Sequence, residues 1–232
     1  VLDWEGGKRA QNGGGHLIIG GRNNGERNYT GLIDEVTVYT EPLAAPEVAA
    51  LATGGSPIVS LPDEDGDGFL DAWELQYSSN LDDLGSTGDV SLLAYLNFDN
   101  QAEDQSGNGL NGTLNGPAAF SADAEGFSGA AGDYAINLGG VNDKSAVIIE
   151  NATLDSALNN NTMAVSFWQN TTQTGNTSSF WIHSPSAGAN ERGFQAHVPW
   201  GNGTIYFDQS GCCNGNQRVT VGGKVIVNQW QH

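Results

Sequence analysis

Residues 29–39 read Tyr-Thr-Gly-Leu-Ile-Asp-Glu-Val-Thr-Val-Tyr, which is typical of a β-strand with one buried face. The apolar side chains of Ile33, Val36 and Val38 recur around the polar pair Asp34 and Glu35. The run therefore predicts a strand over 32–39. Because successive side chains of a strand point to opposite faces, the two adjacent carboxylates are expected to lie apart and not to act as a pair.

Short strands are also predicted on both sides of this run. One precedes it at 16–20, and a short helix follows at 45–52, with Pro46 in its first turn and Gly54 and Gly55 after its end. Beyond residue 91 the expected strands are Leu92–Phe98, Ala135–Leu138, Ser145–Ile149, Met163–Asn170, Ser179–His183, Gly193–His197, Thr204–Asp208, Arg218–Val221 and Lys224–Val227. Short strands separated by turns rich in Gly and Asn predict an all-β, two-sheet sandwich.

The charge of the chain limits its partners. Asp and Glu number 27 against 8 Lys and Arg, which gives a formal net charge of −19. Nucleic acids and anionic membranes require clustered basic residues, so neither is an expected partner. No apolar run approaches the roughly 20 residues of a membrane-spanning helix. No signal peptide is visible and Val1 is not a natural start, so we expect a processed or partial chain. The composition and the motifs described below indicate that it is secreted or held at the cell surface.

A carboxylate-rich loop at 63–74 matches the pattern D-x-D-x-D-G-x-x-D-x-x-E at every required position. Calcium prefers roughly six to eight oxygen ligands, and Gly68 permits the sharp bend that brings them together. The expected ligands are Asp63, Asp65, Asp67, the backbone carbonyl of Phe69, Asp71 and both carboxylate oxygens of Glu74. The alternative is a solvated acidic turn, although carboxylates this close together repel one another without a cation.

Pro57 and Pro62 make the segment before this loop extended, so the loop lacks the entering helix of an EF-hand. It resembles the calcium loops between domains of secreted bacterial proteins and is similar to thrombospondin type 3 repeats. Dockerins are similar too but use two copies, and this chain has one. The resemblance implies a structural calcium ion that stiffens a linker over 54–90.

Residues 92–232 carry three features in an order known from one family. They are a strand ending in Phe98-Asp99 with the turn Asp-Gln-Ser-Gly-Asn-Gly at 104–109, the strand at 163–168, and Trp230 with His232. Together they resemble the opening part of a laminin-G-like, or concanavalin A-like, sandwich. The runs at 17–20 and 29–39, with the helix that follows them, resemble the closing part of the same domain.

The resemblance divides the chain into 1–53, the C-terminal portion of a sandwich; 54–90, the calcium linker; and 91–232, the N-terminal portion. A half-sandwich alone would expose an apolar sheet face and unpaired strand edges. Either the first segment folds back onto the last, or it completes the sandwich of a neighbouring copy. The second arrangement would assemble copies head-to-tail into a filament.

No catalytic motif is found in the sequence. Glycosidases of this fold carry paired carboxylates, typically as E-x-D-x-x-E on one strand, and no such triplet occurs. The patterns H-E-x-x-H and G-x-S-x-G are absent as well. We therefore expect no enzymatic activity. Asp34, Asp99 and Asp104 are expected either to support turns or to bind a second calcium ion.

Four residues are candidates for binding a sugar: Trp181, Arg192, His197 and Trp200. An indole can stack on a sugar face while the polar side chains bond to its hydroxyls. The alternative is that these aromatic residues belong to the core. The adjacent Cys212 and Cys213 are expected to form a disulfide outside the cell, with two free thiols or links to other chains as alternatives.

The sequence therefore predicts a non-catalytic extracellular structural or adhesive repeat module that calcium stabilises. Its expected partners are other copies of itself or extracellular glycans and matrix. The alternative function is a carbohydrate-binding module of a larger secreted protein.

Overall fold

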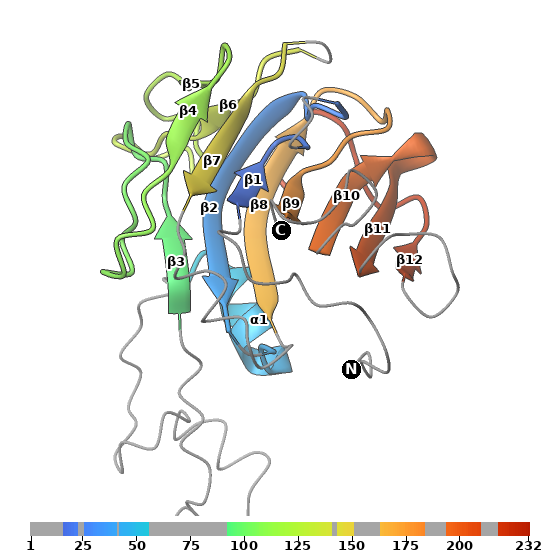
Figure 1. Cartoon of the computed structure of the whole chain (residues 1–232), viewed down its shortest axis with the longest axis horizontal. Helices are drawn as coiled ribbons and strands as arrows, with labels where there is room; N and C mark the ends of the chain where they lie inside the picture. The colour runs from blue at the N-terminus through green and yellow to red at the C-terminus, as the bar shows by residue number, and fades with distance from the viewer. Residues whose placement is uncertain are drawn as a thin grey trace, which may run out of the picture.

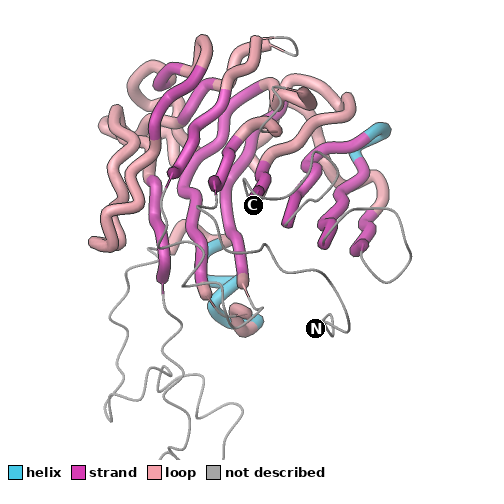
Figure 2. The backbone as a smooth tube through the Cα atoms, viewed as in Figure 1, coloured by secondary structure: helices cyan, strands magenta, loops and turns pink. Residues whose placement is uncertain are grey.

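The computed structural model describes residues 16–22, 26–40, 42–55, 92–140, 143–150, 163–183, 194–209 and 218–232. These residues form an all-β sandwich of two antiparallel sheets, as the sequence predicts (Figure 1). Among them, α1 (Ala45–Leu51) is the only α-helix. Pro46 lies in its first turn, and Gly54 and Gly55 follow its end, as expected. Figure 2 shows this helix at one end of the sandwich, with many of the loops at the opposite end.

The larger sheet contains seven strands. In spatial order they are β12 (Arg218–Val221), β11 (Thr204–Gln209), β10 (Phe194–Trp200), β9 (Phe180–His183), β1 (His16–Ile19), β7 (Ala146–Glu150) and β4 (Thr113–Asn115). Neighbours along this order are antiparallel throughout. The short 3-10 turn η2 (Gly201–Gly203) joins β10 to β11.

The smaller sheet is built around one long strand, β2 (Gly31–Tyr39). On one edge β2 pairs with β8 (Ala164–Thr171) along its whole length. On the other edge it pairs with β3 (Leu92–Leu96) near its end and with β6 (Ile136–Asn137) near its start. The two-residue strand β5 (Ala119–Phe120) extends the sheet beyond β6.

The core lies between the two sheets and is apolar. Its largest fully buried side chains come from both layers and from the turns that join them: Leu17, Ile19, Tyr29, Ile33, Leu96, Phe98, Leu110, Ile136, Leu138, Ile149 and Phe180. Burying a side chain of this size contributes about 1.5–3 kcal/mol relative to leaving it in water. The alternating apolar positions of the sequence therefore form the inner faces of the sheets.

Residues 16–40 contribute an internal strand to each sheet. β1 lies between β9 and β7, and β2 lies between β8 and the β3–β6 edge. Removing β1 and β2 would split each sheet and expose its apolar face. In this structure the first segment thus folds back within its own chain, one of the two arrangements that the sequence leaves open.

A β-bulge in β2 overturns the expectation that Asp34 and Glu35 point to opposite faces. The register against β8 shifts between Asp34 and Thr37, and Glu35 has a positive φ of 51°. Ile33 and Val36 both enter the core, so the two acidic residues between them are excluded from it. The extra residue of a bulge breaks the two-residue alternation on which the expectation rests.

Other expectations differ from the structure in smaller ways. Residues 224–227 are not a strand, because the backbone N–H groups of Lys224 and Val225 both donate to the carbonyl of Gly203, each over 3.1 Å, in place of a ladder. The short strands β4 and β5 are not predicted. The calcium loop at 63–74, Arg192, Cys212 and Cys213 lie outside the described residues.

Candidate functional site

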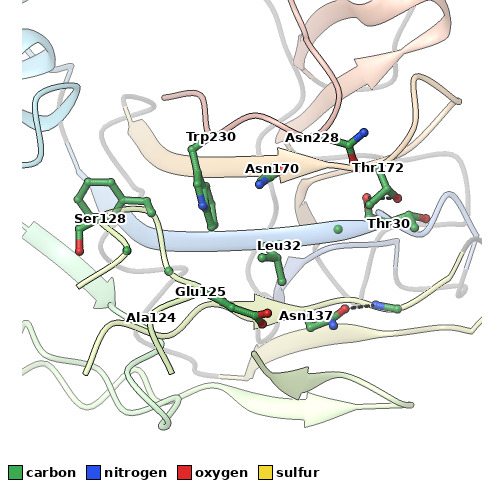
Figure 3. A pocket seen from close by; sticks show the side chains of 15 residues that line it. Thr30, Leu32, Ala124, Glu125, Ser128, Asn137, Asn170, Thr172, Asn228 and Trp230 are labelled. Carbon is green, nitrogen blue, oxygen red and sulfur yellow. Dashed lines mark hydrogen bonds between the residues drawn. The ribbon is translucent and has the colours of Figure 1, made fainter. Parts of the chain in front are cut away.

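A groove of about 610 Å³ crosses the outer face of the smaller sheet. Its floor comes from β2, β6 and β8, which supply Leu32, Asn137 and Asn170 (Figure 3). Two loops form its walls, one at 124–129 and one at 228–230. The full lining is Thr30, Gly31, Leu32, Ala124, Glu125, Gly126, Phe127, Ser128, Gly129, Asn137, Gly139, Asn170, Thr172, Asn228 and Trp230. We call this the sheet groove.

The wall at 124–129 is fixed by carboxylates. The Asp133 carboxylate accepts the backbone N–H groups of Ser128, over 2.7 Å, and Gly129, over 3.2 Å. From beneath, Asp34 in β2 accepts the N–H of Phe127 over 2.9 Å. Glu125 accepts the N–H of Ala122 over 2.9 Å, which closes the first turn of the loop. Carboxylates that accept backbone N–H groups therefore hold the loop to the sheet and fix its own conformation.

The opposite wall carries Trp230 between two backbone anchors. The N–H of Asn228 donates to the carbonyl of Thr171 over 2.8 Å. On the other side of the tryptophan, Gln231 and Gln169 exchange two backbone hydrogen bonds of 2.9 Å each, as an antiparallel bridge. Trp230 is half-buried, and Figure 3 shows its ring lying over β8 and toward β2. An indole held in this way offers a fixed apolar face to a ligand.

Several amides in the sheet groove have no side-chain partner among the described residues and can therefore bind a ligand. The side chains of Asn170 and Asn228 make no hydrogen bond within the described part of the chain. Asn137 uses its amide oxygen to accept the N–H of Gly139 over 3.0 Å, which leaves its NH₂ group available. An amide both donates and accepts, so this set can pair with hydroxyl groups from either side. The arrangement combines one aromatic face with several bidirectional polar groups.

Beneath the sheet groove, the β2 bulge gathers carboxyl groups away from water. Burial raises the pKa of Asp34 to about 8 and that of Glu35 to about 7. Burial likewise raises the pKa of Asp99, although less. Asp34 is 0% exposed and both of its oxygens accept backbone N–H groups, while Glu35 accepts the hydroxyl of Tyr95. In this arrangement Asp34 does not reach a ligand in the sheet groove, and its bonds support the loop above it.

The other acidic candidates are also engaged by the chain itself. The Asp104 carboxylate accepts the N–H groups of Tyr95, Ser106 and Leu110, each over 2.9 Å, and so shapes the turn after β3. Asp99 accepts the N–H of Tyr134 over 3.2 Å. Within the ranges that the structure describes, no three His, Cys, Asp or Glu side chains gather as a metal site. The calcium loop is not among these ranges.

Three of the four sugar-binding candidates named from the sequence, Trp181, His197 and Trp200, lie on the seven-stranded sheet and not at the groove. Trp181 is 3% exposed and His197 is 1% exposed, so neither offers an open face. Burial lowers the pKa of His197 to about 4, and its Nδ1 contacts the carbonyl of Thr177 at 2.6 Å. Trp200 is half-buried, with the Arg27 guanidinium 5.0 Å from its ring centre. Arg192 lies outside the described residues.

Sequence reasoning missed the sheet groove because its residues come from five separate segments. The pattern Asn228-Gln229-Trp230 is typical of the start of a strand and does not indicate that Trp230 lines a groove. The run 124–129 is a polar loop without a motif. The sequence does show several Asn residues near strand ends. Side-chain alternation alone, however, does not predict that they lie on the same face of one sheet.

The comparisons with known proteins add no assignment to this geometry. No protein-family model, curated protein or solved structure matches the chain. No helix in the described part of the chain has the length and apolar character needed to cross a membrane.

Proposed function

We propose that this chain is a non-catalytic extracellular module that binds carbohydrate in the sheet groove. The observation that carries the proposal is the half-buried Trp230 facing a floor and rim of uncommitted amides, Asn170 and Asn228 among them. Specific binding sites combine apolar surface with a few placed polar groups. Of the two functions that the sequence leaves open, this geometry favours carbohydrate binding.

The chemistry of a sugar suits this combination. A pyranose ring has an apolar face of C–H groups that packs on an indole, and hydroxyls at its edge that donate and accept. Amides match hydroxyls because each can take either role. A drug-sized ligand is typically held in a cleft of about 300–1,000 Å³, so the sheet groove has room for a short oligosaccharide segment.

Loss of the Trp230 ring is expected to weaken glycan binding by about fivefold to thirtyfold, since stacking of this kind contributes about 1–2 kcal/mol. The measurement is a glycan array followed by titration of the best ligand with Trp230→Ala. Trp200→Ala is the matched control, because Trp200 lies on the other sheet. Binding that survives in Trp230→Ala but disappears in Trp200→Ala would move the site to the sequence-predicted residues.

The module is also proposed to carry one structural calcium ion at 63–74 and to serve in adhesion. A stiff linker would hold the sheet groove at a defined distance from whatever precedes or follows it. Carbohydrate binding and the adhesive repeat role that the sequence predicts are compatible, since a repeated glycan-binding module joins surfaces through several weak contacts.

Glu74→Gln is expected to weaken calcium binding at least about tenfold, because it removes the carboxylate that supplies two oxygens to the ion. Glu64→Gln is the matched control, since Glu64 occupies a position in the same loop that supplies no ligand. Calorimetric titration with calcium measures both. Chelation should in addition make 63–77 sensitive to protease. Equal affinities in the two variants, or cleavage that ignores calcium, would refute the calcium site.

A further inference from the structure

We propose that the sheet groove selects uncharged glycan chains and that Glu125 makes it reject acidic ones. This inference rests on the carbohydrate-binding function proposed above. It concerns which class of glycan binds, and it follows from the charges and the hydrogen-bonding groups that line the groove.

The charge at the sheet groove has one sign. Of its fifteen lining residues, all described, Glu125 is the one with an ionisable side chain, and none is Lys, Arg or His. Figure 3 shows Glu125 projecting from the 124–129 wall toward the floor near Asn137. Its carboxylate is exposed, and one oxygen accepts the Ala122 N–H. An anionic ligand therefore meets a carboxylate with no cation in the lining to compensate it.

A second carboxylate reinforces the first. Asp133 lies directly behind the same wall, where it accepts the N–H groups of Ser128 and Gly129. The whole chain adds a long-range repulsion of anionic ligands, because its formal net charge is −19. Uronates and sulfated sugars are thus repelled both at a distance and at contact.

The polar groups of the sheet groove also fit hydroxyls better than anions. A hydroxyl can donate to the Glu125 carboxylate and to the amide oxygen of Asn170 or Asn228, and it can accept from their NH₂ groups. A carboxylate or sulfate ester can only accept. Where such a group replaces a hydroxyl opposite Glu125 or an amide oxygen, that acceptor is left without a donor, which penalises binding beyond the repulsion of charges.

The test uses pairs of short oligomers that share a backbone and differ in the charge of one substituent. Oligogalacturonide and its fully methyl-esterified form share one backbone, as do the uncharged N-acetylglucosamine oligomer and its cationic deacetylated form. An array of neutral and acidic glycans identifies further pairs. Full-length protein with calcium is titrated with each pair at low and at high salt. We expect the neutral member to bind at least tenfold more tightly than the acidic one, with a smaller ratio at high salt.

Glu125→Gln should reduce the ratio of neutral to acidic affinity at least about threefold, because glutamine keeps the acceptor for the Ala122 N–H while losing the charge. Glu125→Lys should reduce it further. Glu103→Gln is the control for net charge: Glu103 is exposed and lies outside the groove, so the ratio should stay as in the wild type.

The outcomes separate this inference from the function on which it rests. If no glycan of any charge binds, the proposed function itself is wrong. Trp230-dependent binding of an acidic member as tight as its neutral partner would overturn only the selectivity. The same holds if the cationic member binds tenfold more tightly than the neutral one, or if Glu125→Gln and Glu103→Gln change the ratio equally.

Discussion

Replacement of Gly31 by alanine is expected to destabilise the protein by about 3–5 kcal/mol, which is a large part of a typical domain's stability. Gly31 begins β2 and is paired with Thr171 of β8. A Cβ added there would lie 2.2 Å from the carbonyl oxygen of Asn170 and 2.8 Å from the Cα of Thr171. Both are backbone atoms, so the collision is relieved only if β2 and β8 separate.

The backbone conformation of Gly31 adds to this cost. Its φ of +133° is a value that side-chain-bearing residues rarely adopt. Gly107→Ala separates this strain from the steric collision, since Gly107 also has a positive φ, of 88°, but nothing within 4 Å of an added Cβ. The control should lose about 1 kcal/mol.

Urea denaturation at fixed calcium concentration measures both variants. A lower midpoint at unchanged slope reports lost stability of the same fold. If Gly31→Ala loses no more stability than Gly107→Ala, the close approach of β2 and β8 is wrong. Because Gly31 also lines the sheet groove, the variant that does fold should bind glycan more weakly.

The apolar pattern of the sequence was sufficient to predict the sandwich, because burial alone places such residues. Ile33 and Val38 of β2 and Leu96 of β3 all face the core. The turn at 104–109 was recognisable for a similar reason: Asp104 accepts N–H groups that are close to it in sequence or in the adjoining strand. Features that depend on local chemistry or on one strand's periodicity can be read without knowing the fold.

The sheet groove could not be predicted in this way. Trp230 is brought to the sheet by the bridge between Gln231 and Gln169, residues 62 apart in the chain. The wall opposite reaches β2 through the bond from Phe127 to Asp34, across 93 residues. A site made of loops that meet only in the folded state leaves no spacing pattern. The β2 bulge could not be predicted either, because the two-residue alternation assumes that every residue of a strand is paired.

The stability of the wild-type protein is expected to fall as the pH rises from about 4 to about 8, owing chiefly to Asp34. The pKa of this carboxyl is 3.8 ordinarily and about 8 in the folded protein, because the site excludes water. Between these values the folded state holds the proton that the unfolded chain has released. Stability is therefore present at low pH and is lost with increasing pH, by on the order of 5 kcal/mol.

Two other groups, Glu35 and His197, change this pH dependence of the stability in directions that follow from their own pKa shifts. Glu35, whose pKa is raised from 4.5 to about 7 by burial, adds a loss of the same sign over a narrower range. His197 acts oppositely: its pKa is lowered from 6.5 to about 4, so its contribution is lost as the pH falls through that range. Because the pH ranges of these three contributions overlap, the wild-type curve of stability against pH does not give the contribution of Asp34 alone. A variant is therefore needed.

Asp34→Asn provides the comparison. Asparagine stays uncharged at every pH but offers one acceptor oxygen where Asp34 has two, so one of the N–H groups of Glu35 and Phe127 loses its partner. We expect the variant to be about 1–3 kcal/mol less stable near pH 5. By pH 8 the difference should shrink or reverse, because only the wild type carries a buried charge there.

Denaturation midpoints of both proteins from pH 4 to pH 8, at saturating calcium, give the difference curve. Glu35→Gln is the second comparison, and its difference curve should flatten above about pH 7 while that of Asp34→Asn continues to change. Parallel wild-type and Asp34→Asn curves would mean that Asp34 is ionised in the folded protein throughout. The Phe127 loop would then be held by a buried carboxylate whose charge is compensated by the N–H groups of Glu35 and Phe127.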